Sequence, residues 1–86
     1  MRESVIIIGT GGHSKVVTDI VLRAGDRVLG FLDDNPSGTS FMGFPVLGVT
    51  DDFRRCGNAR FVIAVGNAAA RERLAEKLGD ARLYTA

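Results

Sequence analysis

Cysteine, histidine and tryptophan are scarce in this 86-residue sequence, which has one cysteine, Cys56, one histidine, His13, and no tryptophan. A single cysteine cannot form a disulfide within the chain, and no Cys-x-x-Cys pair or His/Cys cluster is present to hold structural zinc. This cysteine usage is typical of a reducing compartment, so we expect a cytoplasmic protein.

Long hydrophobic runs and an excess of one charge are also missing. The N-terminal apolar run, residues 5–8, is far shorter than a signal-peptide core or the ~20 residues of a membrane-spanning helix, so no membrane partner is expected. Eleven basic and ten acidic residues are spread without blocks, and they give no basic stripe for a nucleic-acid partner. At this length we expect one domain over residues 1–86.

Apolar periodicity predicts strands that alternate with helices. Two continuous apolar runs, residues 5–8 and 61–65, suit strands buried on both faces. Pro45 cannot donate to a ladder, so we expect its strand near the sheet edge. The predicted strands are residues 5–8, 27–32, 44–47, 61–65 and 82–86, and the predicted helices are residues 15–24, 50–55 and 68–78.

The first predicted helix, residues 15–24, is amphipathic. Apolar side chains recur on one face at helical spacing, which predicts that this face is buried. The expected buried face holds Val16, Val17, Ile20, Val21 and Ala24, and the expected exposed face holds Lys15, Thr18, Asp19 and Arg23.

This alternation predicts an α/β fold, a Rossmann-like open parallel sheet of about five strands with helices on both faces. Numbered along the chain, the predicted strands are expected in the order 3-2-1-4-5. A ligand crevice is expected at the carboxyl ends of strands 1 and 4, where the winding reverses. Residues 9–13 should therefore face Gly66 and Asn67 across this crevice.

The segment Gly-Thr-Gly-Gly-His-Ser follows the first strand, at residues 9–14. Between a strand and a helix, glycines let the backbone turn tightly and present N–H groups to a phosphate. A dinucleotide fingerprint would have glycine where Ser14 stands, which weakens the case for NAD. A tight turn that binds nothing is the alternative.

Asp33 and Asp34 end the second predicted strand. A carboxylate there can accept hydrogen bonds from ribose hydroxyls or from a base N–H, such as the imide of uracil, but either aspartate could instead initiate the turn that follows. Asn67 could contact a ligand or only cap its helix. Arg71 and Arg73 on that helix are expected in solvent.

His13 could be a general base, a hydrogen-bonding group for a ligand or a structural residue, and its sequence neighbours do not decide among these roles. Nucleophilic catalysis would need an activated Ser or Cys, and the surroundings of Ser14 lack the pattern of a nucleophile elbow. The residues by themselves therefore assign no catalytic group and no metal ligand.

Four segments together resemble one family, the bacterial sugar acetyltransferases of the sialic acid O-acetyltransferase and bacillosamine-pathway (NeuD/PglD) type. They are residues 9–17 (GTGGHSKVV), 30–34 (GFLDD), 43–48 (GFPVLG) and 64–67 (AVGN), the last with Arg71. The segments occur in the family's order and spacing. Ser14 replaces what is often a glycine in the family.

The resemblance implies a Rossmann-like N-terminal domain that binds a UDP-linked amino sugar or a related sugar and positions it for O- or N-acetylation. In the family a left-handed β-helix of hexapeptide repeats follows, forms a homotrimer, binds acetyl-CoA and carries the catalytic histidine. Residues 1–86 contain no such repeat, so we expect neither a catalytic residue nor a bound cofactor in this chain.

The resemblance also implies which residues contact the substrate. The substrate loop is assigned Gly11, Gly12 and His13, the uridine end Asp33 and Asp34, and the opposite wall Gly66 and Asn67. His13 is thereby a substrate contact rather than a catalytic base.

Two other functions stay open. An NAD(P)-binding domain of an oxidoreductase or epimerase would place an aspartate on the adenosine ribose, but Ser14 and the lack of a Tyr-x-x-x-Lys pair disfavour it. A non-enzymatic nucleotide-binding module is the other alternative.

Overall fold

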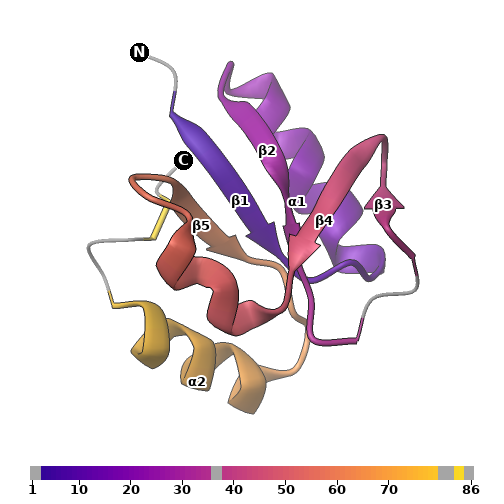
Figure 1. The fold of residues 1–86 in the computed structure, drawn as a ribbon. Coiled ribbons are helices and arrows are strands. Elements are labelled where there is room, and N and C mark those ends of the chain that lie inside the picture. Colours follow the sequence, from indigo (N-terminus) through magenta and orange to yellow (C-terminus); the bar gives the residue numbers. More distant parts are fainter. Residues whose placement is uncertain (1–2, 36–37, 80–82, 85–86) are drawn as a thin grey trace.

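The computed structural model describes residues 3–35, 38–79 and 83–84. Strands and helices alternate along most of the chain (Figure 1). In chain order the elements are β1 (Ser4–Ile8), α1 (Gly12–Arg23), β2 (Arg27–Leu32), β3 (Ser40–Phe41), β4 (Phe44–Gly48), the 3-10 helix η1 (Thr50–Arg55), β5 (Arg60–Ile63) and α2 (Ala68–Leu78). No helix among these residues is long and apolar enough to cross a membrane.

The sheet has the order β3-β4-β2-β1-β5, and all neighbours except β3 and β4 are parallel. The predicted α/β class is confirmed, and strands β4, β2, β1 and β5 follow the predicted order. Of the fifth predicted strand, residues 82–86, the structure describes Leu83 and Tyr84, and Leu83 forms a parallel bridge to Phe61 on β5. The remainder of that prediction lies outside the described residues.

A short antiparallel strand, β3, stands at the edge of the sheet, between two predicted strands where the sequence predicted no further strand. Phe41 pairs with Phe44, and the two residues between them, Met42 and Gly43, have φ values of 53° and 81°. Positive φ at both positions is what a two-residue type I′ hairpin turn requires. The strand that contains Pro45 is therefore covered by β3 and lies one place in from the sheet edge.

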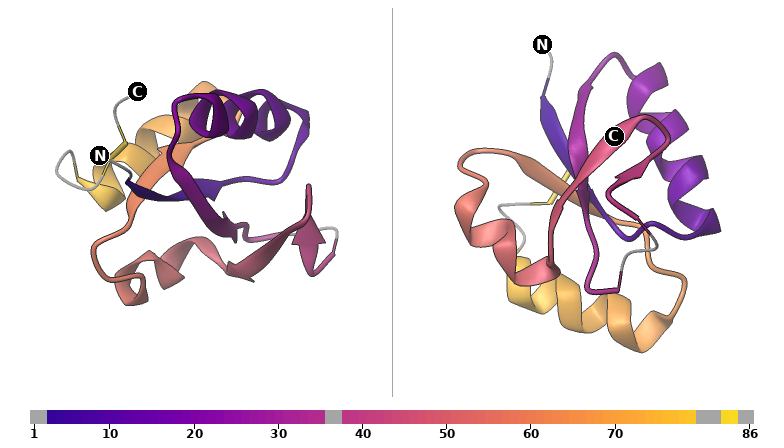
Figure 2. Two further views of the ribbon diagram at one scale, coloured as in Figure 1. Left: turned by 90° about the horizontal axis from the view of Figure 1, so that it is seen from above. Right: turned by 45° about the vertical axis from the view of Figure 1, so that its right-hand side comes forward.

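Two apolar clusters lie on opposite faces of the sheet. One joins Val5, Ile7 and Phe31 to Val21 of α1, and the other joins Ile6 and the neighbouring strands to η1 and α2. Viewed from above, α1 and η1 lie on opposite sides of the strands (Figure 2). Side chains alternate along β1, so this central strand is buried on both faces, as its unbroken apolar run predicted.

The buried face of α1 differs from the predicted one. Ser14 and Thr18 are fully buried together with Val21, whereas Val16 and Ile20 are 58% and 50% exposed. Small hydroxyl side chains let the helix approach the sheet closely, and the Thr18 hydroxyl is satisfied by donating to the Ser14 carbonyl at 2.7 Å. The helix is therefore rotated relative to its apolar stripe, because the turn before it fixes its orientation.

Gly30, in the middle of β2, marks a close approach between strands. Its φ is 157°, and a Cβ there would lie 2.5 Å from the Pro45 carbonyl oxygen and 2.8 Å from Cγ of Leu47. The β1–β2 register shifts by one residue at the same place, between Val5 and Ile6. The absence of a side chain at position 30 thus lets β4 pack against β2.

Replacement of Gly30 by alanine should lower the free energy of unfolding by about 2 kcal/mol or more, because the new methyl group meets backbone that cannot move independently. Gly38→Ala is the control, since the nearest atom to its added Cβ is 3.9 Å away. Urea unfolding of both variants tests this. Equal stabilities would contradict the close approach.

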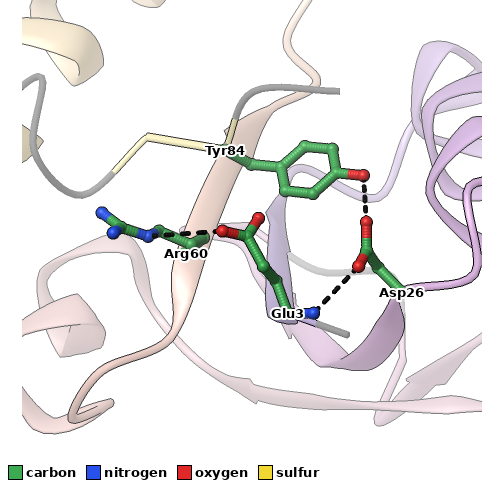
Figure 3. A network of polar contacts seen from close by, with 4 residues as sticks. All are labelled: Glu3, Asp26, Arg60 and Tyr84. Atoms are coloured by element: carbon green, nitrogen blue, oxygen red, sulfur yellow. Dashed lines mark hydrogen bonds and ion pairs between the residues drawn. The ribbon is translucent and has the colours of Figure 1, made fainter. Parts of the chain in front are cut away.

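At the amino ends of the strands, Tyr84 joins a polar network with Asp26, Glu3 and Arg60 (Figure 3). The Tyr84 hydroxyl donates to Asp26 at 2.5 Å, and the Glu3 backbone N–H donates to the same carboxylate at 2.8 Å. The pKa of Asp26 is lowered, mostly by the hydrogen bond from Glu3 and next by the one from Tyr84. The hydrogen bond to Asp26 in turn raises the pKa of Tyr84 to about 12. The network fastens residues 83–84 to the sheet.

Tyr84 is the chain's one tyrosine, and tryptophan is absent, so tyrosinate absorbance reports on this residue alone. We expect Tyr84 to titrate near pH 12 in the folded parent and close to its ordinary value of 10.0 in Asp26→Asn, which removes the negative charge. Circular dichroism at each pH checks that the chain stays folded. Identical titrations would contradict the contact.

The raised pKa of Tyr84 makes the stability of the fold depend on pH. Because the folded state holds the Tyr84 proton more tightly, this contact stabilises the fold below the ordinary pKa of 10.0, and the contribution disappears as pH rises towards 12.

Candidate functional site

A cavity with a volume of about 800 Å³ lies at the carboxyl ends of β1, β2 and β5. The crevice was predicted at this place. Its lining comprises residues 8–13, 32–34 and 64–66 together with Thr50, Ala70, Arg73, Leu74 and Lys77. Of the predicted site residues, the structure brings together Gly11, Gly12, His13, Asp33, Asp34 and Gly66, and Asn67 does not line the cavity.

The turn from β1 into α1 is fixed to both neighbouring strands. The Gly9 N–H donates to the Leu32 carbonyl of β2 at 2.8 Å. Gly9 has φ of 112°, and a Cβ there would lie 3.0 Å from the Ala64 carbonyl oxygen after β5. The buried Ser14 hydroxyl donates to the Gly9 carbonyl at 2.7 Å and lies 3.4 Å from the same Ala64 oxygen. Ser14 thus fastens the turn and is not placed as a nucleophile.

The N-terminus of α1 opens on the cavity. Gly11 is the N-cap residue and provides no side-chain hydrogen bond to the helix. The first helical N–H groups, those of Gly12 and His13, have no acceptor within the helix. Added Cβ atoms at Gly11 or Gly12 would meet nothing within 4 Å, so the backbone is open to a ligand. The exposed His13 side chain lines the same edge.

Asp33 binds the glycine loop to the end of β2. Its Oδ2 accepts from the Thr10 backbone N–H at 2.8 Å and the Thr10 hydroxyl at 2.6 Å, and its Oδ1 accepts from the Asn35 N–H at 2.8 Å. Desolvation alone would raise the pKa of Asp33, but the hydrogen bonds from Thr10 and Asn35 outweigh it and lower the pKa below its usual value. Both oxygens of Asp33 are therefore occupied by the protein.

Asp34 is anchored differently. Its Oδ1 accepts from the Thr50 N–H at 2.8 Å, which connects the end of β2 to the start of η1. Its Oδ2 accepts no hydrogen bond from the residues that the structure describes. The side chain is exposed and lines the cavity, so one carboxylate oxygen is available there.

One face of α2 forms the opposite wall. Asn67 caps this helix, as predicted, because its Oδ1 accepts from the Ala70 N–H at 2.9 Å. Ala70, Arg73, Leu74 and Lys77 line the cavity, and Lys77 forms an ion pair with Asp51 of η1. Arg73 is exposed, as expected, and it also lines this cavity. The spacing i, i+3, i+4, i+7 along the helix was the signal that these residues share a face.

The lining residues that the structure describes form no metal centre. Within residues 3–35, 38–79 and 83–84, no group of three or more His, Cys, Asp or Glu side chains could hold a metal ion. The chemistry that the cavity offers consists of backbone N–H donors at one edge, a carboxylate oxygen at Asp34 and cationic side chains on α2.

The Thr10–Asp33 contact should contribute to folding. We expect Asp33→Asn and Thr10→Val each to lower the free energy of unfolding by about 1–2 kcal/mol, and their effects to be non-additive because both alter the hydrogen bond from the Thr10 hydroxyl to Asp33. Thr10→Ser, which keeps the hydroxyl, is the control. Unfolding of the two single variants and the double variant measures the coupling, and additive losses would contradict it.

The stabilisation that Asp33 provides should depend on pH in one direction. Because the pKa of Asp33 is lowered on folding, its stabilisation is present above the ordinary value of 3.8 and is lost as pH falls through the lower folded value. The difference between the parent and Asp33→Asn should therefore shrink in acid.

The chain is similar to a known protein family and to proteins of known structure. The family model described as the PglD N-terminal domain matches residues 4–78. A UDP-N-acetylbacillosamine N-acetyltransferase of Bacillus subtilis (strain 168) is 37% identical over 82 residues, which are 90% of this chain and 38% of that protein. An uncharacterized protein of Acanthamoeba polyphaga mimivirus is 34% identical over 76 residues, 88% of this chain and 16% of that protein.

Solved structures agree in fold. A mutant of perosamine N-acetyltransferase from Caulobacter crescentus, in complex with CoA and GDP-perosamine, superposes with a TM-score of 0.77 at 32% identity and covers 93% of this chain and 39% of that chain. PerB from the same organism, with the same two ligands, gives a TM-score of 0.76 at 32% identity over the same shares. The chain thus spans well under half the length of these relatives. By sequence and by fold, the chain belongs to the PglD N-terminal domain family.

Proposed function

We propose that the cavity binds the nucleotide part of a nucleotide-linked amino sugar and holds the sugar for an acetyl-CoA-dependent acetyltransferase. One observation carries the proposal: a single cavity has the uncapped N-terminus of α1 at one edge and a carboxylate oxygen of Asp34 with no protein partner among the described residues at another. A diphosphate suits the first, and a base N–H suits the second.

The diphosphate would lie at Gly11, Gly12 and His13. Backbone N–H groups at a helix N-terminus attract anions through their partial positive charge and free donors. The two glycines leave room for close approach. Ser14 gives this turn its rigidity, so the donors would be in place before the ligand arrives.

The base would be recognised at Asp34, and uracil is the base that we propose. Its imide N–H is a single donor, which matches the single unoccupied carboxylate oxygen. Asp33, with both oxygens engaged, acts as a positioning residue that holds the glycine loop. This divides between two residues the uridine contact that the resemblance assigned to both.

The sugar would extend past His13 and Gly66 at the other end of the cavity. His13 is exposed there and lines the cavity, so we assign it a hydrogen bond to the substrate. Asn67 keeps the wall in place by capping α2, and its Oδ1 is used for that purpose.

The chemistry of acetyl transfer would come from other parts of a longer protein. The names of the bacillosamine and perosamine enzymes specify N-acetyltransferases, and the solved structures of the perosamine enzyme hold CoA with GDP-perosamine. We therefore propose that this domain binds the acceptor, in a protein that uses acetyl-CoA and assembles as a homotrimer in the cytoplasm. The names of the relatives support an amine as the acceptor.

Calorimetric titration with UDP, GDP and NAD tests the proposal. The parent should bind UDP, and Asp34→Asn should weaken UDP binding about tenfold or more because it removes a charge-assisted hydrogen bond. Asp19→Asn is the matched control, because Asp19 lies on the exposed side of α1 in an ion pair with Arg23. Binding of NAD but not UDP, or equal UDP affinity in both variants, would contradict the assignment.

A further inference from the structure

The charged side chains of the cavity are mostly engaged by the protein. Asp33 is held by Thr10, Asp34 by Thr50, and Lys77 pairs with Asp51 across the gap between α2 and η1. Arg73 is exposed, lines the cavity, and forms no ion pair with any residue that the structure describes. The lining therefore contains one cationic side chain whose charge is not offset by a neighbour in the described part of the chain.

Arg73 also has a defined position along the cavity. The lining face of α2 starts at Ala70, one turn after Gly66, and ends at Lys77, which reaches η1 beside Thr50. At 1.5 Å per residue, Arg73 lies about 4.5 Å along the helix axis from Ala70 and about 6 Å from Lys77. It is thus placed between the Gly66 end, proposed for the sugar, and the Asp34 end, proposed for the base.

We propose that Arg73 binds the diphosphate from the α2 side of the cavity, opposite the N–H groups at the start of α1. This inference rests on the proposed function and adds a specificity: the site favours ligands with a charged diphosphate over the nucleoside alone. A guanidinium suits the role because its planar fork can donate two parallel hydrogen bonds to phosphate oxygens. Lys77 remains with Asp51 and supports the wall.

The experiment compares two arginines of the same helix. Arg71 is exposed, lies two residues from Arg73 and does not line the cavity, so Arg71→Gln is the control for Arg73→Gln. Both variants, in the 86-residue chain, are titrated with UDP and with uridine. Thermal unfolding of each establishes that the fold is retained, which the exposure of both side chains favours.

We expect Arg73→Gln to weaken UDP binding about tenfold or more, with uridine binding unchanged, and Arg71→Gln to behave as the parent. Arg73→Lys keeps the charge without the fork and should lie between the two. The dependence of UDP affinity on salt should also decrease in Arg73→Gln.

Three results would overturn the inference, and they differ from one another. If the parent binds UDP and Arg73→Gln binds it equally well, Arg73 does not contact the diphosphate, and the proposed function stands without it. If the parent binds neither UDP nor uridine, the proposed function fails, and this inference fails with it. An equal loss of UDP and uridine affinity in Arg73→Gln would show a structural effect instead of a phosphate contact.

Discussion

The attachment of the β1–α1 turn to both neighbouring strands is the constraint on which the rest of the structure depends. Gly9 bonds to Leu32 on one side and allows the approach of Ala64 on the other, and the buried Ser14 hydroxyl closes the turn. This attachment sets the rotation of α1. It explains why Thr18 is buried while Ile20, on the apolar stripe, is half exposed.

The same attachment determines which polar groups face the cavity. Since the turn is held before any ligand binds, the open N-terminus of α1 is directed into the space between β2 and α2. Asp33 extends the attachment to the next loop, and Asp34 continues it to η1 through Thr50. The Lys77–Asp51 pair then links η1 to α2. The walls are thus connected by polar contacts that leave the N–H groups at the start of α1 and one carboxylate oxygen of Asp34 facing the cavity.

Much of this arrangement could be predicted because it depends on local signals. Continuous apolar runs marked β1, which is buried, and β5, which is half-buried at Val62 and Ile63. Asn67 marked the start of α2, which the structure confirms. The hairpin at Met42 was missed because its positive φ is unusual for methionine, and the face of α1 was wrong because tertiary contacts of Ser14 override the stripe. The exposure of Arg73 was predicted, but its place beside the cavity was not, because an exposed arginine on a polar helix gives no sign in sequence that a cavity lies next to it.

Amide NMR spectra of the chain during a UDP titration would locate the bound nucleotide residue by residue. We expect the largest chemical-shift changes to cluster at Gly11, Gly12 and His13 and at the Asp34–Thr50 contact. The amides of Glu3 and Tyr84, at the opposite ends of the strands, should stay unchanged. Changes concentrated around Glu3 and Tyr84, or no changes in a folded chain at saturating UDP, would contradict a nucleotide site at the start of α1.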